Sequence, residues 1–101
     1  MPKLYEYFGL IVYFYANEHE PVHVHGEFQG RESKAEIFLR DGRVVRIVFR
    51  SILGRRPLTG AKLRDFKKLV RVKADDIVRR WIDFHVTRKH NEPEIITRKL
   101  K

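Results

Sequence analysis

Residues 22–50 read VHVHGEFQGRESKAEIFLRDGRVVRIVFR, and this stretch decides the fold. Polar and apolar side chains alternate over residues 22–28, as expected for a strand that buries one face. Two further strand-like runs, 34–40 and 43–50, flank an Asp-Gly dipeptide that is typical of hairpin turns. The stretch therefore predicts three consecutive antiparallel strands.

The loop of the second hairpin sets which side chains face each other. A two-residue loop would place Ile37 opposite Arg46 and would mix the buried and exposed faces of the strands. A three-residue loop over residues 40–42, with Gly42 left-handed at a bulge, pairs Ile37 with Val45 instead. Face consistency therefore favours the longer loop.

The segments on either side complete the predicted fold. Residues 4–15 are rich in aromatic and β-branched types, and because both alternating sets are apolar they predict one central strand buried on two faces. From residue 60 the apolar residues follow a helical period: Leu63, Phe66, Val70, Ile77, Trp81 and Phe84. This predicts one long kinked helix or two helices divided near residues 72–73, and the acidic pair Asp75-Asp76 favours two.

We therefore predict an α+β domain with a four-stranded, mainly antiparallel sheet over residues 4–50. One or two C-terminal helices pack on one face of this sheet. Residues 1–87 form the single domain, and residues 88–101 form a charged C-terminal tail.

Composition narrows the class of protein. The chain has 101 residues, a formal net charge of +9 and no cysteine, which excludes disulfides and any cysteine-based zinc or redox site. An apolar run over residues 8–16 is too short to span a bilayer. We expect a cytoplasmic protein, and the sequence leaves its oligomeric state open.

Positive charge is concentrated in one segment. Residues 43–73 contain eleven Lys or Arg residues and a single acidic residue, Asp65, whereas residues 1–30 carry a net charge of −3. Such a segment attracts polyanions, so it predicts RNA or an acidic protein as partner, unless it is only a solvated surface. The candidate binding residues are Arg43, Arg46, Arg50, Arg55, Arg56, Lys67, Lys68 and Arg71.

Three of the five histidines, His19, His23 and His25, lie within seven residues. Strand alternation places His23, His25 and Glu27 together on the face opposite Val24. Two imidazoles about 7 Å apart on a strand can bind zinc or another divalent transition metal, with His19 as a third ligand. One of them can instead act as general acid or base in metal-independent RNA cleavage, with arginines steadying the phosphate. Surface histidines without either role are the third reading.

The chain resembles a family of small bacterial proteins, domain-of-unknown-function family forty-one sixty, over residues 1–86. The resemblance rests on Met1-Pro2, on Gly9-Leu10-Ile11, on Trp81 with a following aromatic residue, and above all on the His-x-Pro-x-His-x-His string of residues 19–25. Members usually have a second proline where this chain has Val22. The resemblance implies a gene that lies beside a second small gene, in a toxin–antitoxin-like pair, but it implies no reaction.

Together these observations predict a component of a toxin–antitoxin-type module that binds an acidic protein partner encoded nearby, or RNA. The alternatives are a metal-independent endoribonuclease that uses the histidine cluster and a metal-binding module with the same histidines as ligands.

Overall fold

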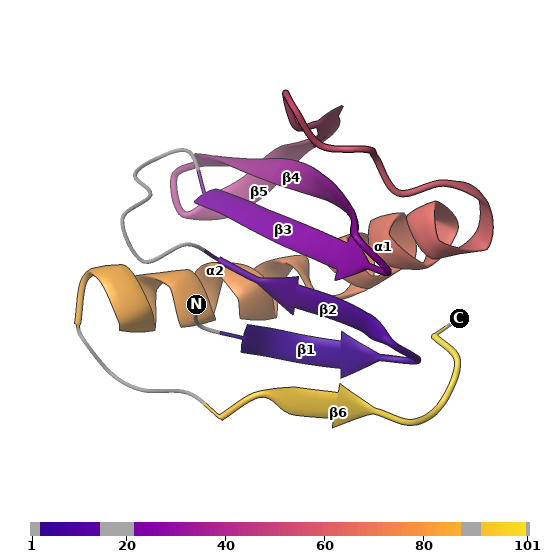
Figure 1. The fold of residues 1–101 in the computed structure, drawn as a ribbon. Coiled ribbons are helices and arrows are strands. Elements are labelled where there is room, and N and C mark those ends of the chain that lie inside the picture. The colour runs from indigo at the N-terminus through magenta and orange to yellow at the C-terminus, as the bar shows by residue number, and fades with distance from the viewer. Residues whose placement is uncertain (1–2, 15–21, 88–91, 101) are drawn as a thin grey trace.

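The computed structural model describes residues 3–14, 22–87 and 92–100, which form a sheet with two helices on one face (Figure 1). The elements are β1 (Lys3–Tyr7), β2 (Leu10–Tyr13), β3 (Val22–Phe28), β4 (Arg31–Arg40), β5 (Arg43–Ser51), α1 (Gly60–Val72), α2 (Ala74–His85) and β6 (Glu94–Ile96). The α+β class and the two helices are confirmed. The predicted four-stranded sheet is wrong, because the described residues form a sheet of six strands in the order β5-β4-β3-β2-β1-β6.

One extra strand comes from the N-terminal segment, which is a hairpin and not a single strand. Phe8 (φ 48°) and Gly9 (φ 86°) are both left-handed and form the two-residue turn between β1 and β2. Because the first turn position holds an aromatic residue, only Gly9 distinguishes the turn from the strands on either side. The other extra strand, β6, lies in the predicted tail and pairs in parallel with β1, where Ile96 is buried.

The hairpin of β4 and β5 has the two-residue turn, so the predicted three-residue loop is wrong. Asp41 (φ 51°) and Gly42 (φ 78°) form this turn, and a bulge lies close to it. Leu39 pairs with Val44 and Phe38 with Arg46, which leaves Val45 as the extra residue. The bulge restores the match of faces, and Ile37 lies opposite Ile47.

Both helices turn the predicted apolar positions toward the sheet, where four of the six are buried and Leu63 and Phe84 are partly buried. Phe66 and Val70 on α1 and Ile77 and Trp81 on α2 belong to the core beneath the sheet. Phe66 packs directly on the backbone of β3 at Gly26. A Cβ atom added to this glycine would lie only 2.5 Å from the Phe66 ring. No helix in the described ranges is long and apolar enough to cross a membrane.

A partly buried polar network joins α2 to β1 and to the segment just before β6. The Tyr5 hydroxyl donates to the carboxylate of Asp76, which also accepts from Arg79 and from Arg80 Nε (2.8 Å). Arg80 Nη1 in turn donates to the Glu92 carbonyl at 2.8 Å. Burial, followed by the bond to Asp76, raises the pKa of Tyr5. Burial also opposes ionisation of Asp76, but hydrogen bonds from the side chains of Tyr5, Arg79 and Arg80 outweigh it and lower the Asp76 pKa to about 2.

Candidate functional site

The predicted histidine face is the helix-free face of the sheet, where His23 lies opposite Glu36 on β4. His23 Nε2 is 3.5 Å from Glu36 Oε2, and the imidazole is partly exposed. His25, two residues further along β3, is only 4% exposed and stacks on the ring of Tyr13 with centroids 5.6 Å apart. The two imidazoles therefore share a face but occupy different environments.

His25 belongs to a polar network around the buried carboxylate of Glu32, and sequence reasoning missed this network. Glu32, 2% exposed, receives His25 Nδ1 at 3.1 Å on one carboxylate oxygen and Arg55 Nη2 at 3.0 Å on the other. The Glu32 amide also donates to the Arg56 carbonyl at 2.8 Å. The Glu32 carboxylate therefore contacts an imidazole and a guanidinium at the same time, one on each oxygen. The network therefore ties the loop over residues 52–59 to the start of β4.

Metal binding by the cluster stays a prediction. No group of three or more His, Asp or Glu side chains in the described ranges is arranged to hold a metal ion. His19, the third predicted ligand, lies outside these ranges.

The predicted basic residues fall into separate groups. Arg43, Arg46 and Arg50 lie on β5, the edge strand. Lys67 and Arg71 on α1 reach the same strand from the helix side, with Lys67 Nζ 5.7 Å and Arg71 Cζ 5.2 Å from the centroid of the Phe49 ring. We call these five cations and β5 the basic edge. Arg55 and Arg56 lie in the following loop, and Lys68 is apart from the rest, where it donates to the Leu100 carbonyl.

Charge at the basic edge is largely uncompensated. Arg50 Nε donates to Glu36 Oε1 at 2.5 Å, and this hydrogen bond, partly opposed by burial, lowers the pKa of Glu36. Within the described ranges, no carboxylate lies within ion-pair distance of Arg43, Arg46, Lys67 or Arg71. Across the hairpin Glu36 lies opposite Val48, and it reaches Arg50 two residues further along β5.

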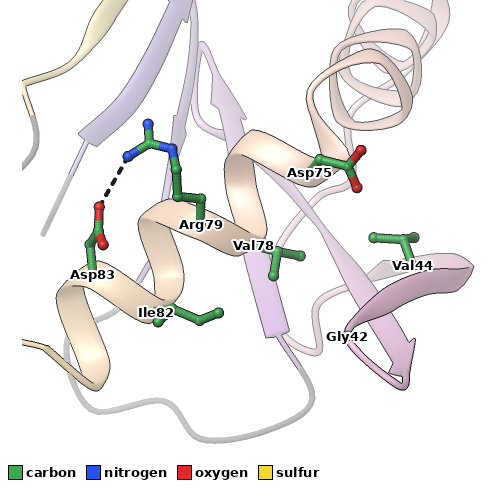
Figure 2. A pocket seen from close by; sticks show the side chains of 7 residues that line it. All are labelled: Gly42, Val44, Asp75, Val78, Arg79, Ile82 and Asp83. Carbon is green, nitrogen blue, oxygen red and sulfur yellow. Dashed lines mark hydrogen bonds and ion pairs between the residues drawn. The ribbon is translucent and has the colours of Figure 1, made fainter.

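Two hollows flank β5 on the helix side, one near each end of the strand. The larger, about 340 Å³, lies between Val44 at the start of β5 and the α2 side chains Val78 and Ile82, with Asp75 and Asp83 at its border (Figure 2). The smaller, about 150 Å³, lies beside Phe49, Ser51, Leu58 and Lys67. Each hollow combines apolar walls with charged side chains.

The apolar side chains exposed around this surface are aliphatic. Leu39 is 39% exposed, Val45 56%, Leu53 101% and Val72 51%. The ring of Phe49 is covered by Lys67 and Arg71. Aliphatic groups among cations suit the side chains of a protein segment better than the stacked bases of single-stranded RNA, which need open aromatic faces.

The fold and this surface define a small α+β domain whose described sheet ends in a basic edge strand, with a histidine–glutamate–arginine network around the buried carboxylate of Glu32. The model of a domain-of-unknown-function family, DUF4160, matches residues 9–82, and the chain belongs to this family. No curated protein and no solved structure matches the chain significantly.

Proposed function

We propose that this protein binds an acidic segment of a partner protein through the basic edge, as one component of a toxin–antitoxin-type module. The observation that supports this most is the group of unpaired cations around β5. Ion pairs between these cations and carboxylates of the partner, once shielded from water, would fix the register of the complex. The positive electrostatic field of the basic edge would also speed association with an acidic partner.

Aliphatic exposure supports a protein partner over RNA. Val45 and Leu39 lie among the cations and offer an apolar contact that a phosphate backbone would not use. A protein segment that carries both carboxylates and aliphatic side chains would satisfy both features of the surface.

The test is co-purification with the product of the neighbouring small gene. We expect the wild-type chain to retain it, and the variant Arg46→Glu/Arg71→Glu to lose it. The matched control is Lys3→Glu/Arg98→Glu, which changes the net charge equally but lies on β1 and just after β6, at the other end of the sheet. Circular dichroism verifies that both variants fold.

If the wild-type chain does not co-purify with the neighbouring gene's product, the protein is not a component of such a module. If both variants retain that product equally, the basic edge is not the binding surface. Tight RNA binding at physiological salt, lost only in Arg46→Glu/Arg71→Glu, would assign the surface to RNA instead.

A metal-independent ribonuclease is the second candidate, and one observation favours it. The partly exposed imidazole of His23 lies beside Glu36, whose carboxylate holds the Arg50 guanidinium, so a potential base and a phosphate-binding cation share one face. Incubation with total RNA in EDTA tests this, with His23→Ala as the variant. Identical products from wild type and variant would exclude His23 from any such reaction.

A further inference from the structure

The strand β5 has an unusually open edge for a small domain. It runs for nine residues, pairs with β4 on one side, and is last in the strand order of the described sheet. The opposite edge strand, β6, has only three residues and follows Pro93. A long free edge presents a row of unpaired N–H and C=O groups, which is a template for another strand.

The charges at this edge decide what kind of strand can pair there. Arg46 and Arg50 lie on the helix-free face of β5, and Lys67 and Arg71 approach on the helix side. A second copy of β5 would bring like charges together, which is unfavourable. An acidic strand would gain ion pairs along the whole edge.

The hollows determine the side-chain pattern of that strand. Val44 faces the helices and borders the larger hollow (Figure 2). Phe49 also faces the helices and borders the smaller hollow, whereas Arg46 faces the opposite way. A paired strand directs alternate side chains to the two faces. Its helix-side residues would be apolar and enter the hollows, and its other residues would be acidic and meet Arg46 and Arg50.

We propose that the basic edge is a β-strand addition site for an extended partner segment in which apolar and acidic residues alternate. At about 3.3 Å per residue, a segment of about eight residues spans both hollows. Main-chain hydrogen bonds supply affinity in this mode, and the side chains that enter the hollows supply specificity. This inference rests on the proposed function and specifies how the acidic partner is recognised.

The probe is a fluorescein-labelled peptide of about ten residues that alternates valine and glutamate, titrated with the full-length chain by fluorescence anisotropy. Two further versions carry N-methyl groups on the odd or on the even amides. Only every second amide of an added strand points toward its neighbour, so only one of these versions should fail. We expect that version to bind more than about tenfold more weakly, and the other to bind within about threefold of the parent peptide.

N-methylation leaves the charge unchanged, so binding driven by charge alone would treat the two versions alike. Equal binding or equal loss would therefore overturn strand addition. If the neighbouring gene's product still depended on Arg46 and Arg71 for co-purification, the proposed function would survive that failure. Analytical ultracentrifugation without peptide gives a further test. If the chain sediments as a dimer and the peptide dissociates it, the edge binds a second copy of the chain, and the proposal is overturned.

Discussion

Replacement of Gly26 by alanine should destabilise the protein, because this glycine lets α1 approach the sheet. The added Cβ atom would lie 2.5 Å and 2.7 Å from two ring carbons of Phe66. Carbon atoms pack best at about 3.5–4.0 Å, so the overlap is about 1 Å. Phe66 is fully buried, and its ring cannot move away without displacing its neighbours.

The expected loss follows from two opposing terms. Alanine within a strand is better than glycine by about 0.5–1 kcal/mol. Overpacking of a filled core costs about 1–3 kcal/mol, and a 1 Å overlap with a buried ring belongs at the upper end. The net prediction for Gly26→Ala is a decrease of about 2 kcal/mol in the free energy of unfolding, measured by urea denaturation.

A double-mutant cycle isolates the cause. Phe66→Leu removes the ring atoms in question and should itself destabilise the core, but Gly26→Ala should cost little in that background. The loss of stability in the double mutant should therefore be smaller than the sum of the two single losses. We expect the difference to be at least about 1 kcal/mol. Strict additivity, or a neutral Gly26→Ala, would refute the packing argument.

Three further effects on stability follow from the described contacts. Ser33→Ala removes the buried acceptor of the Leu58 amide (3.0 Å), and urea denaturation should show a loss of about 1–3 kcal/mol. Asp76 has a folded-state pKa of about 2 against an ordinary 3.8, so its contribution is complete above pH 4 and disappears as pH falls toward 2. Its partial exposure limits this contribution to about 1–2 kcal/mol, and acid titration followed by circular dichroism should show Asp76→Asn losing that dependence. Glu36→Gln breaks the ion pair with the exposed Arg50 and should cost only about 0.2–1 kcal/mol in thermal denaturation at neutral pH.

The hydrophobic periodicity of the sequence predicted the helices and strands that bury one face. The errors in the predicted fold arose at single turn and bulge residues whose conformation the periodicity does not reveal. The amphipathic spacing from Leu63 onward located both helices, and alternation located β3. The turn at Phe8 was missed because its left-handed conformation is unusual for an aromatic residue, so Gly9 was its only compositional signal. The bulge at Val45 was placed in the loop instead, because face matching requires an extra residue but does not say where it lies.

The site was predictable only as far as local pattern reaches. Alternation correctly assigned His23 and His25 to one face, but it did not show that His25 is buried. That burial involves Glu32 and Arg55, and their meeting depends on how the loop after β5 folds back on β4. The same limit applies to the cations, since only the tertiary fold brings Lys67 and Arg71 onto the ring of Phe49.

The histidine string and the basic edge are physically connected. The His25 imidazole contacts the Glu32 carboxylate, which also contacts the guanidinium of Arg55. Arg55 lies in the loop that continues to Leu58. Leu58 in turn forms part of the smaller hollow beside the end of β5. A buried carboxylate that lost either basic partner would be costly to keep ionised, so the network gives this loop a defined position. In this arrangement His25, through Glu32 and Arg55, helps to position one end of the surface at which we propose that a partner strand docks.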